Sequence, residues 1–169
     1  MTPSLHRGQH LVVWSPPEAP WYKINYDVTT FAEDITVGLG IVILNSEGLV
    51  MASLTQQIPL LAIVIEIEPL AAWRAMELAL EIGLANIVLE GDNETMFKAL
   101  KSGDRSLAQH DHLTKDILFL SSYCSAFTVS FICRQCNKLA HSLPSMTIWM
   151  EDVPPDLVSI FKADLTSLS

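Results

Sequence analysis

Residues 86–103 read NIVLEGDNETMFKALKSG and place a short apolar segment, an acidic turn and an amphipathic segment one after another. The apolar run 86–90 predicts a strand that ends in Gly91-Asp92. Residues 93–101 predict a helix, which Ser102-Gly103 ends because glycine readily takes the left-handed conformation there. Helical spacing assigns three side chains to its inward face, Met96, Phe97 and Leu100. A strand that leads directly into a helix is the unit from which α/β domains are built.

Upstream of this unit, three predicted strands follow one another closely. Residues 21–28 alternate between apolar and polar side chains, which predicts a half-buried strand. The polar residues 29–37 predict a loop. Apolar strands are then expected over 38–44 and 49–57, joined as a hairpin by residues 45–48. Strands joined in this way imply an antiparallel part of a sheet.

A longer helix is expected over 68–82. Pro69 suits its first turn, where the missing amide is no loss, and Gly83 is a natural stop. One face of this helix carries Glu68, Ala72, Ala75, Ala79 and Ile82. Small residues on that face let the helix lie close to a sheet, and Glu68 then projects at the end of the packed face.

The later part of the chain continues the alternation of helix and strand. We expect a helix over 107–123, a strand over 127–133 and a short helix over 137–146. Strands separated by helices imply right-handed parallel crossovers. The fold class is therefore α/β, with a mixed sheet of antiparallel and parallel strands.

One domain fits the 169 residues, half of which are apolar. We expect a tail or linker over 1–20, where Pro16, Pro17 and Pro20 exclude regular structure, the domain over 21–148, and a second tail over 149–169.

The charge balance limits the classes of partner. Lys and Arg total 10 and Asp and Glu total 19, giving a net charge of -9. This balance argues against a protein that grips nucleic acid by bulk charge alone, but it suits a site whose carboxylates hold cations. Six of the ten basic residues are the candidates for any phosphate-binding face, namely Lys98, Lys101, Arg105, Lys115, Arg134 and Lys138.

Cysteine usage and hydropathy indicate a compartment. Three cysteines provide no disulfide framework, the polar start of the sequence has no apolar signal region, and the apolar run 58–65 is too short to cross a bilayer. We expect an intracellular protein, nuclear or cytoplasmic, that is not secreted and has no membrane partner.

Three carboxylates fall where strands end and helices begin. Asp27 ends the first strand, Glu68 begins the long helix and Asp92 follows the strand 86–90. Ligand sites in α/β sheets gather at such places. Converging carboxylates repel one another unless a cation neutralises them, and Mg²⁺ prefers oxygen ligands. Cations held there can activate water and stabilise the leaving oxygen in phosphodiester cleavage. Read alone, Asp27 would be a turn residue and Asp92 a helix N-cap.

A series of short motifs occurs in a specific order between residues 14 and 164. The motifs are WSPP (14–17), YKINYD (22–27), GLGIVI (38–43), SEG (46–48), Glu68 with AA (71–72) and LALEIGL (78–84), IVLEGDN (87–93), and RQCNKLAHSL (134–143). In these motifs the sequence resembles the ribonuclease H-like domain of the plant reverse-transcriptase-like group, which is related to the ribonuclease H segment of non-LTR retroelements.

The resemblance implies a ribonuclease H-like fold, a five-stranded mixed sheet with helices on both faces. It also implies metal-dependent hydrolysis of the RNA strand of an RNA–DNA hybrid, with Mg²⁺ or Mn²⁺ as the cofactor. Asp27, Glu68 and Asp92 match the metal-binding acids, and His141 matches a fourth position that is Asp in many members. Asn137 matches an Asn of the last motif. With its basic neighbours Arg134 and Lys138, it is the expected nucleic-acid contact.

Three positions depart from the pattern of that family. Val28 stands where Gly is usual, Pro69 where Ala is usual, and His141 where Asp is common. With the acidic charge balance, they keep open an alternative in which the domain is a retroelement-derived binding module, for nucleic acid or protein, with weak or no catalysis. A third hypothesis is a zinc-stabilised interaction module that uses Cys133 and Cys136. The oligomeric state and the natural substrate are left open by the sequence.

Overall fold

The computed structural model describes residues 15–31, 35–59, 67–103, 112–133 and 149–150. These residues form six strands and three helices. The strands are β1 (Tyr22–Phe31), β2 (Thr36–Leu44), β3 (Val50–Pro59), β4 (Asn86–Gly91), β5 (Ala126–Phe131) and β6 (Trp149–Met150). The helices are α1 (Ile67–Glu81), α2 (Glu94–Ser102) and α3 (His112–Ser121).

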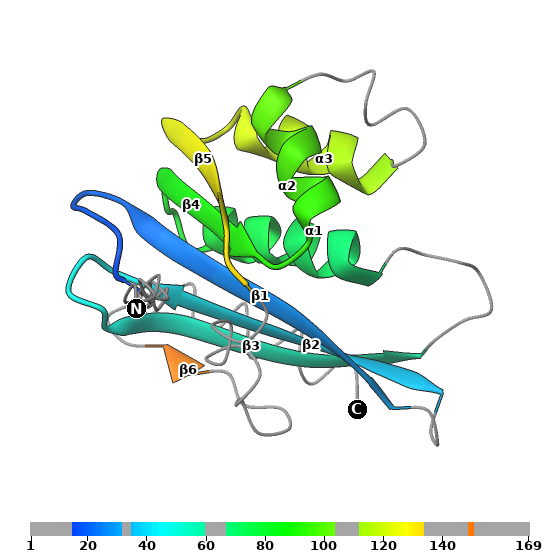
Figure 1. The fold of residues 1–169 in the computed structure, drawn as a ribbon. Coiled ribbons are helices and arrows are strands. Elements are labelled where there is room, and N and C mark those ends of the chain that lie inside the picture. The colour runs from blue at the N-terminus through cyan, green and yellow to red at the C-terminus, as the bar shows by residue number, and fades with distance from the viewer. Residues whose placement is uncertain (1–14, 32–34, 60–66, 104–111, 134–148, 151–169) are drawn as a thin grey trace, which may run out of the picture.

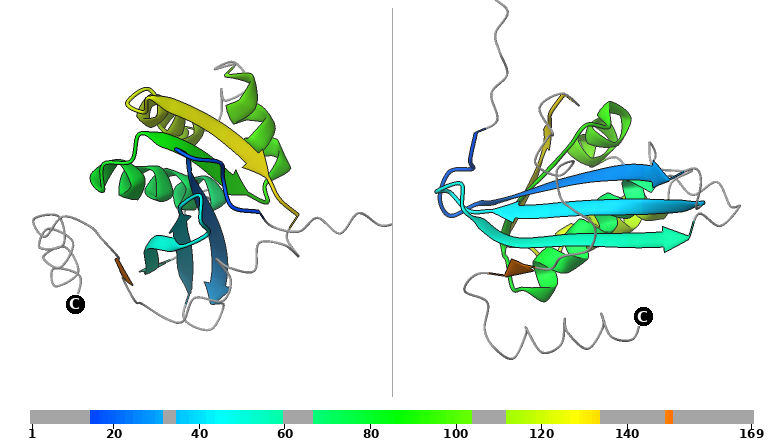
Figure 2. Two further views of the ribbon diagram at one scale, coloured as in Figure 1. Left: turned by 90° about the vertical axis from the view of Figure 1, so that its left-hand side faces the viewer. Right: turned by 90° about the horizontal axis from the view of Figure 1, so that it is seen from below.

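All six strands belong to one sheet, in the order β5-β4-β1-β2-β3-β6. Strands β1, β2 and β3 form an antiparallel meander, whereas β4 runs parallel to β1 and β5 runs parallel to β4. The predicted mixed sheet, with three antiparallel strands and further parallel ones, is confirmed. The sheet is strongly twisted, as Figure 2 shows by the angle between the pair β4–β5 and the pair β2–β3.

Helix α1 lies against the middle of the sheet, across β1, with α3 beside it (Figure 1). Its small residues allow this close approach, since Ala72, Ala75 and Ala79 have no exposed surface. The predicted inward face of this helix is therefore confirmed.

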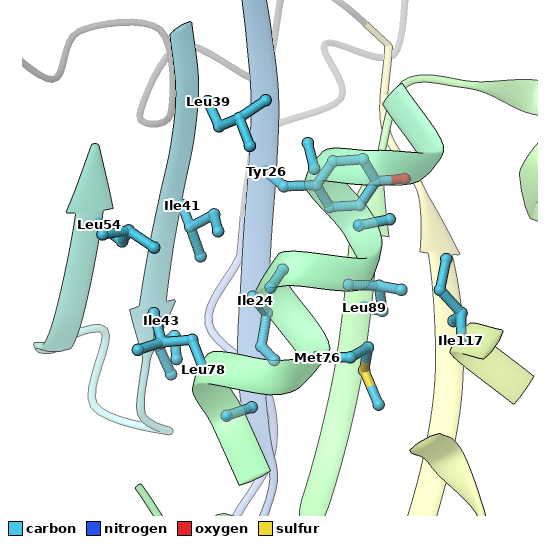
Figure 3. Packing of buried hydrophobic residues seen from close by; sticks show 14 of the residues in the cluster. Ile24, Tyr26, Leu39, Ile41, Ile43, Leu54, Met76, Leu78, Leu89 and Ile117 are labelled. Carbon is cyan, nitrogen blue, oxygen red and sulfur yellow. The ribbon is translucent and has the colours of Figure 1, made fainter. Parts of the chain in front are cut away.

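The core is a single cluster that takes residues from the sheet and from all three helices. Figure 3 shows its inner layer, with Ile24 and Tyr26 of β1 between Ile41 of β2 and Leu89 of β4. Met76 of α1 and Ile117 of α3 are fully buried in the same cluster. Burial of so many branched side chains from different elements supplies the main stabilisation of the fold.

The hairpin between β2 and β3 closes as the sequence predicted. The side-chain oxygen of Asn45 accepts hydrogen bonds from the amides of Glu47 and Leu49, both at 2.9 Å. Gly48 has a φ of 77°, a value that glycine takes without steric cost.

The loop predicted over 29–37 is wrong at both ends, over residues 29–31 and 36–37, whereas residues 32–34 lie outside the described part of the chain. Strand β1 continues to Phe31 and β2 begins at Thr36, with Thr29 opposite Gly38 and Thr30 opposite Val37. Asp27 therefore lies inside a strand and not at its end. The segment looked like a loop because its residues are polar, but they are the exposed end of a hairpin, where pairing to the neighbouring strand makes them extended.

Two predictions concern the end of the chain. Trp149–Met150, placed in the tail 149–169 by the sequence, form the short strand β6 against Ala52 and Ser53 of β3. The helix predicted over 137–146 lies outside the described residues, and so does the start of the helix predicted over 107–123. Among the described helices, none has the length and apolar character to span a membrane.

Candidate metal-binding site

Two of the predicted acids lie just beyond the paired residues of the parallel strands β1 and β4. The register of this pair sets Asn25 beside Glu90, and Asp27 and Asp92 each follow by two residues along their own segments. Asp27 also lies opposite Gly40 of β2, and it is only 8% exposed. Asp92 follows the last residue of β4 and is half-buried. The topology thus brings two acids that are far apart in the chain to one end of the sheet.

Tyr26 lies on the helix side of the sheet, with its ring against Gly91 (Figure 3). A Cβ atom at Gly91 would overlap the ring and hydroxyl of Tyr26, so only glycine lets the ring lie there. Burial raises the pKa of the Tyr26 hydroxyl, and the charges of Glu68 and Asp92 raise it further. The phenol therefore stays neutral, and both carboxylates lie close enough to act on it.

Glu68 stands in the first turn of α1 and is half-buried. The side-chain amide of Asn93 donates a hydrogen bond of 2.7 Å to Oε2 of Glu68. This contact ties the start of α1 to the residue that follows Asp92. Of the three acids named by the sequence, Glu68 and Asp92 both act on the Tyr26 hydroxyl, and Asp27 is the next residue after Tyr26 on β1.

The reading of Asp92 as a helix cap is wrong, because Asn93 is the N-cap of α2. Its backbone is extended, with φ -91° and ψ 102°, and its Oδ1 accepts a hydrogen bond of 2.9 Å from the amide of Met96. Sequence reasoning missed both contacts of Asn93. The signal was present, since asparagine is among the best N-cap residues, but a contact to Glu68 has no sequence pattern.

A buried polar network lies next to the acids, on the strand positions that alternate with Ile24 and Tyr26. The ammonium of Lys23 contacts Oε2 of Glu90 at 3.1 Å, and the Asn25 amide donates a hydrogen bond of 2.9 Å to Oε1 of the same residue. Lys23 also donates a 2.7 Å hydrogen bond to the carbonyl of Ser15. The sequence predicted a strand with one solvated side, and this network explains why that side is buried instead.

The donor set suits a hard divalent cation in kind, since all three predicted ligands supply carboxylate oxygens. In the part of the chain that the structure describes, no three His, Cys, Asp or Glu side chains are close enough to hold one metal ion together. Mg²⁺ generally takes only one or two carboxylates and completes its shell with water and substrate phosphates. By the chemistry of their oxygens, Asp27 and Asp92 can supply those one or two ligands.

The predicted basic face is only partly described. Lys98 pairs with Glu94 at 2.7 Å on the exposed side of α2, and the Lys101 ammonium lies 5.3 Å from the centre of the Phe97 ring. The Phe97 ring in turn packs on Phe131, with 6.0 Å between ring centres. This part of α2 therefore offers cations next to aromatic rings.

Several predicted site residues lie outside the described residues. These are the fourth ligand His141 and the nucleic-acid contacts Arg134, Asn137 and Lys138. Cys133 is exposed, and Cys136, its partner in the zinc hypothesis, also lies outside the described part. The roles assigned to all of these residues stay predictions.

Solved structures with the same fold come from three sources. Ribonuclease H1 from the archaeon Halobacterium salinarum matches with a TM-score of 0.60 and 20% identity, covering 73% of this chain and 93% of that one. The N-terminal ribonuclease H domain of a Mycobacterium tuberculosis protein, solved as a fusion with maltose-binding protein, matches with a TM-score of 0.58 and 15% identity, covering 88% and 99%. The ribonuclease H1 named LC11, isolated from compost, matches with a TM-score of 0.54 and 17% identity, covering 71% and 89%.

These identities are low, so the structural matches show the fold, which is ribonuclease H-like as predicted. No curated protein matches the sequence significantly. The family model described as reverse transcriptase-like matches residues 25–147, a span that contains Asp27, Glu68, Asp92 and His141. The chain therefore belongs to the reverse transcriptase-like family.

Proposed function

We propose that this domain binds RNA–DNA hybrids and cleaves their RNA strand with the help of Mg²⁺ or Mn²⁺. The observation that carries the proposal is that Glu68 and Asp92 both lie close enough to act on Tyr26, which directly precedes Asp27 on β1. The family and the ribonuclease H-like fold support it, because the structural neighbours are named as ribonucleases H.

Each acid is held by a different element, which keeps its position defined. Asp27 is part of the central strand β1, Asp92 follows β4, and Glu68 is fixed by the hydrogen bond from Asn93. Asp27 and Asp92 would hold a cation, with Glu68 completing the acidic set. A cation bound there would supply positive charge to the reacting phosphate and its leaving oxygen. His141 would assist, and Arg134, Asn137 and Lys138 would contact the nucleic acid.

The test is cleavage of an end-labelled RNA–DNA hybrid in Mg²⁺ and, separately, in Mn²⁺. Asp92→Asn removes one carboxylate charge and keeps the shape of the side chain, so cleavage should fall at least about 100-fold if catalysis depends on this charge. Asp116→Asn is the matched control, because Asp116 is exposed on α3. Equal cleavage by Asp92→Asn and by the unmodified chain would refute the proposed catalytic site.

A second function, hybrid binding without hydrolysis, is favoured by the surroundings of the acids. The Glu68 carboxylate is engaged by Asn93, and the described acids do not form a three-ligand group. Val28 follows Asp27 directly and adds a branched side chain next to the site. Retention of the labelled hybrid in a binding assay, with no cleavage in either metal and no effect of Asp92→Asn, would favour this function.

A further inference from the structure

Asn93 connects the first turn of α1, which carries Glu68, to the start of α2, which follows Asp92. Its Nδ2 donates to Oε2 of Glu68 at 2.7 Å, and its Oδ1 accepts from the amide of Met96 at 2.9 Å. Both ends of the side-chain amide are therefore engaged at once. This arrangement fixes the orientation of the amide, because reversing it would put a donor against the Met96 amide and an acceptor against Glu68.

The contact matters because it holds a side chain that can otherwise take many conformations. Its side chain has several rotatable bonds and starts from the first turn of a helix, so fixing it in one orientation carries an entropic cost. The amide of Asn93 fixes one carboxylate oxygen, and the second oxygen of a carboxylate can still accept another partner. The contact is charge-assisted, which makes it one of the stronger kinds of hydrogen bond.

The surroundings keep Asn93 in place. It lines a cavity of about 10 Å³ together with Tyr26, Gly91, Met96 and Leu100, which is enough space for about one water molecule. Tyr26 is buried beside Gly91, and the charges of Glu68 and Asp92 both act on its hydroxyl. Asn93 thus lies next to the buried Tyr26 ring and also contacts the Glu68 carboxylate of α1.

We propose that Asn93 is a positioning residue, whose amide holds the Glu68 carboxylate in the orientation that receives a divalent cation. This inference rests on the proposed function, since it needs Glu68 to face a cation. A hydrogen-bonding partner behind a metal ligand typically contributes 10–100-fold to metal affinity. The competing role is purely structural, in which Asn93 serves only as the cap of α2.

The variant Asn93→Ser separates these two roles. Serine still offers an oxygen that caps α2, but its side chain is too short to reach Glu68. We expect the Mn²⁺ affinity of the protein alone, measured by isothermal titration calorimetry, to fall about 10-fold, with the unfolding temperature nearly unchanged. Glu94→Gln, which removes an exposed carboxylate in the first turn of the same helix, is the matched control and should leave Mn²⁺ affinity unchanged.

A double-mutant cycle shows whether Asn93 acts through Glu68. In a Glu68→Ala background, Asn93→Ser should cause no further loss of Mn²⁺ affinity. Asn93→Thr is used in the same way if the serine variant does not fold.

In the unmodified chain, addition of Mg²⁺ should shift the NMR signals of the Asn93 side-chain amide.

The outcomes distinguish this inference from the function on which it rests. Three results would each overturn the positioning role while leaving the cation site standing. The first is unchanged Mn²⁺ affinity in the serine or threonine variant. The others are a loss of affinity in the Glu68→Ala background as large as in the unmodified chain, and Asn93 amide signals that do not move. Failure of the unmodified chain to bind Mn²⁺ would overturn the cation site, and the positioning role with it.

Discussion

Replacing Lys23 by methionine should destabilise the fold strongly, although the two side chains have similar length. The Lys23 ammonium lies 3.1 Å from Oε2 of Glu90, and the two side chains are only 10% and 4% exposed. Without the ammonium, the Glu90 carboxylate keeps the hydrogen bond from Asn25 but loses its counter-charge in a site that water barely reaches. The carbonyl of Ser15 loses a donor as well.

The magnitude follows from the geometry. Removing one partner of a buried ion pair generally costs 3–5 kcal/mol, and the remaining hydrogen bond from Asn25 places the expected loss near the lower end, about 3 kcal/mol. For a chain of this length, each kcal/mol corresponds to roughly 2–4 °C, so the unfolding temperature should fall by about 6–12 °C.

Thermal unfolding followed by circular dichroism measures this loss, and urea unfolding gives the free energy independently. Lys98→Met is the matched control, because the Lys98–Glu94 pair has a shorter distance, 2.7 Å, but both side chains are more than half exposed. It should change the unfolding temperature little. The double variant Lys23→Met/Glu90→Gln should recover part of the loss, because it removes the stranded charge and keeps an amide oxygen that accepts from Asn25. A Lys23→Met variant as stable as Lys98→Met would show that the network is not a buried one.

Two further predictions concern Tyr26 and the glycine beneath its ring. Gly91→Ala should cost about 1–3 kcal/mol of unfolding free energy in urea titrations, because the buried Tyr26 ring has no room to move. Gly38→Ala should cost clearly less, because its Cβ meets the tip of the exposed Phe31 ring, and equal losses in the two variants would contradict this packing. The raised pKa of Tyr26 means that the folded state holds the phenolic proton more tightly than the unfolded chain, so stability should fall as the pH rises above 10. Tyr26→Phe removes this group, so its urea midpoint should decline less above pH 10 than that of the unmodified chain.

Hydropathy and turn residues were enough to predict the order of the elements from β1 to β5, but not the short strand β6. The alanine face of α1, the hairpin that ends in Gly48 and the strand that ends in Gly91 each follow from local rules about spacing and backbone conformation. The same local rules failed over residues 29–31, which are polar and still extended. Their conformation depends on the partner strand β2, and pairing between strands is not visible in the composition of one of them.

In the candidate site, too, some features could be predicted from local sequence and others could not. Acids at strand ends and helix starts could be selected from the sequence, because the sheet topology determines which ends meet. The contacts between side chains could not. Asn93 reaches Glu68 across 25 positions of sequence, and Lys23 meets Glu90 because β1 and β4 happen to pair in one particular register. Such contacts depend on tertiary packing, which leaves no periodic signal in the chain.

The central position of β1 has a consequence for how the molecule assembles. Its antiparallel neighbour β2 is close in sequence, whereas its parallel neighbour β4 is separated from it by two strands and a helix. Closing the longer loop costs more chain entropy, so the meander can form early and the parallel pair later. A folding intermediate that has completed the meander but not docked β4 would contain Asp27 without Asp92. The acidic end of the sheet would then be among the last parts of the molecule to form, and its appearance would report that folding is complete.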